Sequence, residues 1–118
     1  MQKLITTLGA ITIGAALVAP AFAGDAAAGK THYMEQKCDK CHGDMGKGDG
    51  PTAAKLKMEI ADWTNKASMS KMTDDDLHAI IEKGGKAVGK SPKMPAYGKK
   101  LDSKAIDDIV AWIRSLAS

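Results

Sequence analysis

Cys38-Asp39-Lys40-Cys41-His42 is the stretch of this sequence that decides the fold. Two thiols three positions apart lie within reach of the two vinyl groups of one haem, and the histidine that follows can place an imidazole beneath the iron. Redox dithiols and half zinc sites share the paired cysteines, but the adjoining histidine and the lack of any other cysteine argue against both. The stretch therefore predicts one covalently attached haem c.

Residues 1–23 have the pattern of a secretory signal peptide. Lys3 supplies the charged start, an apolar run follows, and Ala21-Phe22-Ala23 fits the small-x-small cleavage pattern. We expect cleavage after Ala23, which leaves one domain over 24–118, of 118 − 23 = 95 residues, in the periplasm. An uncleaved anchor is the alternative, although the apolar run is shorter than the roughly 20 residues that a spanning helix needs.

Composition points to one small domain that does not bind nucleic acid. Without Lys3, 16 basic residues face 14 acidic ones, and no clustered basic face is evident. So short a chain buries limited apolar surface, and we expect the haem to form part of the core. Trp63 is expected to be a core residue whose indole N–H also donates to a haem propionate.

Helical periodicity predicts an all-α fold of three to four helices around the haem. We expect a helix over 25–37 that Asp25 caps, a short one over 52–58, one that opens at Thr73 and ends at Gly84-Gly85, and one over 103–116. We expect loops of the Ω type between them. The stretch 43–51 has four glycines in nine residues and predicts a tight turn rather than a calcium loop, because its spacing lacks the required carboxylates.

The sixth ligand of the iron is predicted to be Met94. Pro92 and Pro95 bracket it in a loop, where the thioether can be held rigidly toward the metal. Several other side chains carry a sulfur or nitrogen donor. We treat Met69 and Met72 as the second choice, Met58 as packing, Met45 as too near the motif, and His32 and His78 as solvated helix residues, with a bis-histidine site as the alternative.

Residues 24–118 resemble the class I c-type cytochromes. The resemblance rests on the haem motif and on five further pieces of sequence. These are Gly29 with Tyr33, Gly48-Asp49-Gly50-Pro51, Ile80-Ile81-Glu82-Lys83-Gly84-Gly85, Met94-Pro95-Ala96-Tyr97-Gly98 and Ile109-Val110-Ala111-Trp112-Ile113-Arg114-Ser115-Leu116. Two features depart from the family: Tyr33 lies five residues before the first cysteine instead of four, and Glu59-Ile60-Ala61 stands where relatives often have prolines.

The resemblance implies a role for each site residue. Cys38 and Cys41 would form the thioethers, while His42 and Met94 would be the proximal and distal ligands of the iron. The carbonyl of Pro51 would accept a hydrogen bond from the other nitrogen of His42. The first and last helices would cross, with Gly29 and Tyr33 against the region of Trp112.

These features together predict a one-electron carrier rather than an enzyme, because protein ligands on both faces leave the iron no site for substrate. The alternatives are the haem subunit of a larger oxidoreductase complex and a sensor in which Met94 dissociates. We expect a monomer, without stable membrane insertion after signal cleavage, that meets redox partners with acidic faces. The lysines expected near the haem are Lys40, Lys47, Lys86, Lys90, Lys93, Lys99 and Lys100.

Overall fold

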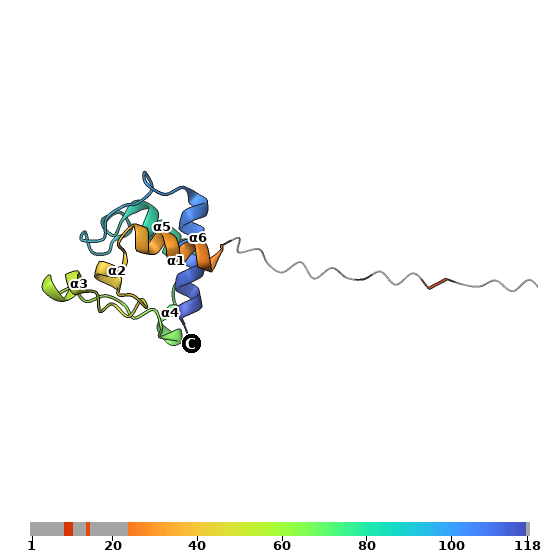
Figure 1. Ribbon diagram of the computed structural model, residues 1–118, viewed down its shortest axis with the longest axis horizontal. Helices are drawn as coiled ribbons and strands as arrows, with labels where there is room; N and C mark the ends of the chain where they lie inside the picture. Colours follow the sequence, from red (N-terminus) through yellow and green to blue (C-terminus); the bar gives the residue numbers. More distant parts are fainter. Residues whose placement is uncertain (1–8, 11–13, 15–23, 118) are drawn as a thin grey trace, which may run out of the picture.

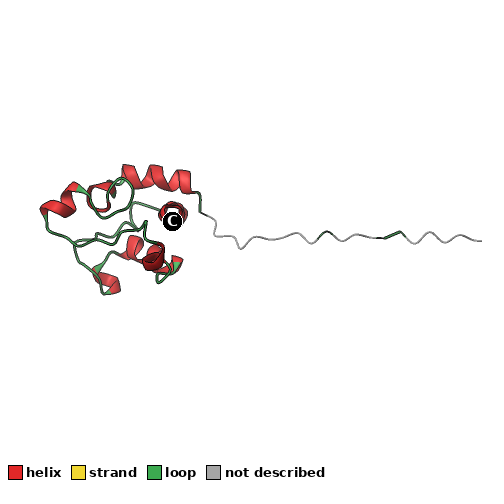
Figure 2. Ribbon diagram, turned by 90° about the horizontal axis from the view of Figure 1, so that it is seen from below, coloured by secondary structure: helices red, strands yellow, loops and turns green. Residues whose placement is uncertain are grey.

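The computed structural model describes residues 9–10, 14 and 24–117. The described chain is helical and holds no strand, in agreement with the predicted all-α class (Figures 1 and 2). The helices are α1 (Ala26–Glu35), α2 (Asp39–His42), α3 (Pro51–Lys55), α4 (Lys66–Met69), α5 (Asp74–Lys83), η1 (Lys86–Val88) and α6 (Ser103–Leu116). Apart from 9–10 and 14, the predicted signal peptide and its cleavage site lie outside the described residues. No helix in the described ranges combines the length and apolarity needed to cross a membrane.

Helices α1 and α6 cross in close contact, as predicted (Figure 1). Gly29 makes the approach possible, because a Cβ there would overlap the carbonyl group of Asp108 and lie 2.8 Å from the amide nitrogen of Ile109. One turn later the Tyr33 ring packs on that of Trp112, with centroids 4.3 Å apart. A tight helix crossing at glycine thus fixes the direction in which α1 delivers the chain to the haem motif.

The end of α1 differs from the prediction, which ran the helix to Lys37. The helix starts as expected, since the Asp25 carboxylate accepts hydrogen bonds from the N–H groups of Ala27 and Ala28. It ends at Glu35 because Lys37 adopts a left-handed conformation with φ of 60°. The Cys38 N–H then donates back to the Tyr33 carbonyl at 3.0 Å, which closes the helix and turns the chain into the motif.

Helices α5 and α6 begin and end where the sequence indicates. Thr73 and Asp76 form the expected capping box, and Gly84, with φ of 82°, ends α5. Asp102 caps α6 by accepting from the Ala105 N–H at 2.8 Å, and the helix covers the predicted 103–116. Both helices therefore present their apolar faces to the interior in the predicted register.

The segment between the motif and α5 holds the other differences. Helix α3 begins at Pro51 and stops at Lys55, short of the predicted Met58, because Lys57 is left-handed with φ of 52°. Helix α4 was not predicted; Asn65 caps it by accepting from the Ser68 N–H at 3.1 Å. The predicted loop over 86–100 contains the 3-10 turn η1.

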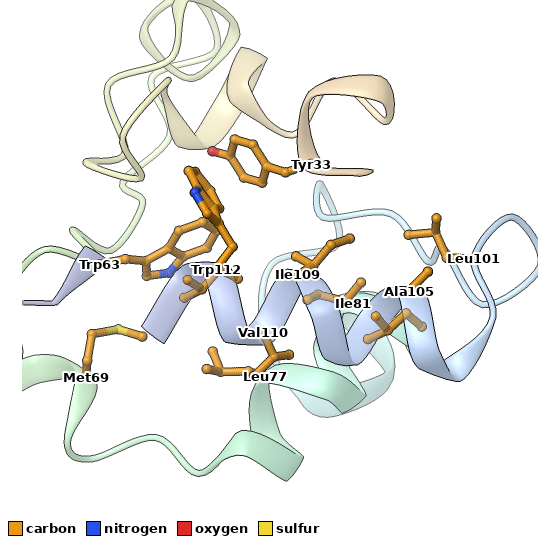
Figure 3. Close-up of a cluster of buried hydrophobic side chains, with 12 residues drawn as sticks. Tyr33, Trp63, Met69, Leu77, Ile81, Leu101, Ala105, Ile109, Val110 and Trp112 are labelled. Carbon is orange, nitrogen blue, oxygen red and sulfur yellow. The ribbon is translucent and has the colours of Figure 1, made fainter. Parts of the chain in front are cut away.

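The core lies between the three longer helices and the loops that face them (Figure 3). Its aromatic end is formed by Tyr33, Trp63 and Trp112, and the apolar faces of α5 and α6 continue it. The remaining buried members are Met69, Leu77, Ile81, Leu101, Ala105, Ile106, Ile109, Val110 and Ile113. Trp63 is 8% exposed, which confirms its predicted place in the core.

Candidate haem site

Helix α2 carries the haem motif. Cys38 precedes the helix, and Cys41 and His42 follow one turn later, so the three side chains come from a single short element. Both cysteines are free thiols, and both are partly buried. Burial raises the pKa of Cys38 to about 11, which keeps this thiol protonated at neutral pH. A redox dithiol motif instead lowers the pKa of its cysteine, so this environment argues further against a thioredoxin-like role.

A cavity of about 730 Å³ opens beside the motif. The cavity is lined by Cys38, Cys41 and His42 of the motif, and also by Met94, which lies in a loop much later in the chain. Apolar side chains of α5 and α6 form much of the remaining wall, namely Leu77, Ile80, Ile81, Ile109 and Ile113. A large apolar cavity with two thiols, an imidazole and a thioether at its wall fits a covalently attached, axially ligated haem.

His42 is held as a neutral imidazole. Burial lowers its pKa to about 4, so the ring keeps a lone pair at neutral pH. Its Nδ1 is buried and has no hydrogen-bond partner among the described residues. The predicted bond to the Pro51 carbonyl is therefore not present in this structure; Pro51 instead lines a second, polar cavity of about 470 Å³ on the glycine-rich loop. A histidine that binds a metal through one ring nitrogen usually donates a hydrogen bond from the other. The unsatisfied Nδ1 of His42 leaves that second position available.

Met94 is held by its loop rather than by a helix. Its carbonyl accepts from the Gly85 N–H at 3.0 Å, and the N–H of Tyr97 donates to the Ile81 carbonyl at 2.9 Å. The N–H of Gly98 donates to the Glu82 carbonyl at 3.0 Å. The end of α5 therefore serves as the platform on which the methionine loop docks.

The other candidate ligands fall into two groups. Met58 and Met72 also line the cavity. The remaining candidates do not line it: Met69 is buried in the core, Met45 is 52% exposed on the second cavity, and neither His32 nor His78 reaches the wall.

His78 is not the solvated residue that was predicted. Its side chain is 22% exposed, and its ring nitrogens lie 2.8 Å from Asp107 Oδ1 and 3.1 Å from Glu82 Oε2. Burial lowers the pKa of His78, but the hydrogen bonds to the two carboxylates outweigh it and leave the pKa raised. This histidine ties α5 to α6, a contact that only the packing of two helices creates.

Lysines lie at the cavity, but only some of the predicted ones. Lys90 and Lys93 line it, whereas Lys40 and Lys47 line the second cavity. The sequence reasoning missed Lys37 and Lys57, the two left-handed residues that follow the ends of α1 and α3. Each directly precedes a cavity residue, Cys38 or Met58, and this adjacency was a signal that the sequence offered.

The chain was compared with known proteins. The family model "Cytochrome c" matches residues 26–117. A cytochrome c6 of Gloeothece citriformis is 35% identical over 115 residues, which cover 96% of this chain and 93% of the relative. A cytochrome c6 of Rippkaea orientalis is 34% identical over 103 residues, covering 86% and 79% respectively.

Two solved structures share the fold. The c-type cytochrome KustC0563 superposes with a TM-score of 0.63 at 20% identity, over 76% of this chain and 98% of that one. A chain of the reducing HAO-like protein complex Kustc0457/Kustc0458 of Kuenenia stuttgartiensis superposes with a TM-score of 0.64 at 26% identity. That match covers 79% of this chain and 44% of the other.

Proposed function

Because this chain belongs to the cytochrome c family, we propose that it is a periplasmic carrier of single electrons that holds the iron of its haem c between His42 and Met94. The protein is a small class I c-type cytochrome with covalently attached haem, an electron carrier rather than an enzyme. The observation that carries the proposal is the cavity of about 730 Å³, whose wall includes both cysteines, His42 and Met94.

Four side chains are proposed to bind the cofactor, two through covalent bonds to the haem and two as ligands of its iron. The bound haem supplies reversible one-electron chemistry at its iron. Cys38 and Cys41 would hold the haem covalently, each thiol adding its S–H across one vinyl group to form a thioether. His42 and Met94 would be the two protein ligands of the iron, and with both bound no position would be left for a substrate. The apolar wall from α5 and α6 excludes water from the iron, which disfavours the extra positive charge of the ferric state.

Met94→Ala tests the axial pair. We expect the ferric protein to lose the far-red absorption band of sulfur ligation and its reduction potential to fall. Met72→Ala and Met58→Ala are matched controls, because both residues line the same cavity. Loss of the band in either control, with the band kept in Met94→Ala, would assign the ligand elsewhere. Carbon monoxide binding by the reduced native protein at neutral pH would favour the sensor alternative.

Trp63 and Pro51 are proposed to support the cofactor. Trp63 lines the cavity, and its indole N–H is proposed to donate to a propionate. The Pro51 carbonyl is proposed to accept from His42 Nδ1 in the haem-loaded protein, an arrangement supported by the unsatisfied state of that nitrogen. Nitrogen-15 spectra of the reduced protein test the second bond, since a coupling across it should connect the imidazole to the carbonyl of residue 51.

The periplasmic location follows from the signal peptide proposed for residues 1–23. The mass of the protein isolated from cells tests it, because cleavage after Ala23 leaves 95 residues with one haem. A full-length mass in the membrane fraction would support the uncleaved anchor.

The lysines at the cavity are proposed to steer acidic redox partners to the haem. The support is their place on the wall: Lys37, Lys57, Lys90 and Lys93 all line it, against one acidic residue, Glu59. Reduction of the ferric protein by anionic ferrocyanide should slow as salt is added, whereas reduction by cationic hexaammineruthenium(II) should not. Replacing Lys90 and Lys93 by Gln should reduce the salt dependence of the ferrocyanide rate several-fold. Lys30 is exposed on α1, and Lys30→Gln should leave that salt dependence unchanged.

A second candidate is a subunit of a larger complex. One observation favours it: a structural relative, 26% identical, is a chain of the reducing HAO-like protein complex. Size-exclusion chromatography of the native extract separates the two candidates, because a free carrier should elute at the mass of a monomer.

A further inference from the structure

Trp63 lies flat against His42. The two ring centroids are 4.3 Å apart and the ring planes differ by 19°, which makes this a stacked pair. We propose that Trp63 is a positioning residue that sets the rotation of the His42 ring, and so the orientation of the imidazole plane relative to the haem. The proposal rests on the proposed function in one respect, that His42 ligates the iron.

The indole is fixed relative to His42 by the backbone as well as by stacking. The backbone N–H of Trp63 donates to the Gly46 carbonyl at 2.8 Å, and the backbone N–H of Gly48 donates to the His42 carbonyl at 2.8 Å. The same short loop thus holds both residues. A Cβ at Gly46, which has φ of 70°, would lie 2.7 Å from Trp63 Cε3, so the loop backbone lies directly against the indole. Tyr33 supports the indole from another side, with centroids 6.2 Å apart at 65°.

The imidazole has little else to fix its rotation. Its Nδ1 has no hydrogen-bond partner within the described residues, so no polar contact sets the angle of the ring here. A ligating histidine normally has such a partner, which fixes both the ring and its tautomer. The flat face of a buried indole restricts rotation about the Cβ–Cγ bond in a different way, because turning the imidazole would drive its edge into the stacked ring. Trp63 therefore supplies an orienting contact independent of any bond to Pro51.

The native haem-loaded protein provides the first test. In the reduced, diamagnetic state we expect nuclear Overhauser contacts between the His42 ring protons and the six-membered ring of Trp63. Their absence, with the haem attached and the far-red band of the ferric form intact, would overturn the proposal and leave the axial ligand assignment standing. Absence of the far-red band from the ferric native protein would instead contradict the proposed function.

Variants provide the second test, with the orientation of the imidazole plane as the readout. That orientation sets the anisotropy of the electron paramagnetic resonance spectrum and the spread of the haem methyl shifts in the ferric protein. Trp63→Leu should change both patterns, whereas Trp63→Phe keeps an aromatic face and should retain them. Trp112→Phe is the matched control, because Trp112 is equally buried but packs on Tyr33 and not on His42.

Three outcomes are decisive. If Trp63→Phe shifts the patterns as much as Trp63→Leu, the indole N–H and not the stack is responsible, and the proposal is wrong. Equal shifts in Trp63→Leu and Trp112→Phe would reduce the role of Trp63 to general packing. If Trp63→Leu does not accumulate with haem, Trp63→Tyr takes its place, and an unchanged pattern in that variant without Overhauser contacts to His42 contradicts the proposal.

Discussion

Gly29→Ala tests the helix crossing on which the haem motif depends. The added Cβ would overlap the Asp108 carbonyl group and lie 2.8 Å from the Ile109 nitrogen, where ordinary contact begins at 3.4 Å; the shortfall there is 3.4 − 2.8 = 0.6 Å. The obstacle is helix backbone, so α1 must shift as a unit. Overpacking of this kind costs about 1–3 kcal/mol, and a clash with helix backbone belongs near about 3 kcal/mol, from which alanine recovers about 1 kcal/mol of helix propensity. We expect a net loss of about 2 kcal/mol in the free energy of unfolding.

The assay is reversible denaturation of the haem-loaded protein, followed by circular dichroism. For a domain of this size a loss of about 2 kcal/mol corresponds to roughly 8–16 °C in Tm. Lys30→Ala, at an exposed position on the same helix, should stay within about 0.5 kcal/mol of the native protein. If Gly29→Ala were as stable as the native protein or more so, helix propensity would outweigh the clash and the account of the crossing would be refuted.

Three other side chains make hydrogen bonds between separate parts of the chain, and each can be replaced. Arg114→Lys should destabilise by about 1–3 kcal/mol in urea titrations, because the guanidinium donates through two separate nitrogens to the carbonyls of Met69 and Met72, whereas lysine offers a single nitrogen. Tyr33→Phe should cost about 1–3 kcal/mol by thermal unfolding, since it leaves the buried Gly43 carbonyl without its 2.5 Å donor. The raised pKa of His78 stabilises the fold fully below the unfolded pKa of about 6.5, and this stabilisation is lost as pH rises through the folded pKa. His78→Phe should therefore flatten the fall in the free energy of unfolding above a pH of about 6.5. An unchanged dependence of the free energy of unfolding on pH would contradict this prediction.

The sequence predicted correctly those helix ends that are determined by neighbouring residues. The bounds of α6 and the capping box of α5 follow from residues within one turn of each helix end. The pairing of Gly29 with Tyr33 indicated a close crossing, because a glycine and a ring four positions apart share a helix face. Helix α4, in contrast, is too short to show periodicity, and the carbonyl of its last residue, Met69, accepts a hydrogen bond from Arg114, 45 positions away.

The errors at the site have two different physical causes. His78 was predicted to be solvated because, within its own helix, it lies outside the apolar stripe. The contact that covers it comes from Asp107 on α6. The left-handed conformation of Lys37 was missed because this conformation is expected of glycine or asparagine after a helix. For His78 the missing information lies in which elements pack together, and a single sequence does not contain it; for Lys37 it lies in the local backbone.

The apolar residues that the sequence assigned to the core have two functions in the structure. Leu77, Ile81, Ile109 and Ile113 belong to the buried cluster and also line the cavity of about 730 Å³. Their packing is therefore complete only when an apolar group fills that space, and a chain of this length has little other core to compensate. The same faces of α5 and α6 exclude water from the proposed iron site, so the fold and the electron-carrier chemistry depend on one set of contacts. A substitution at any of these four positions should therefore change stability and reduction potential together, whereas one at Ile106, buried outside the cavity wall, should change stability alone.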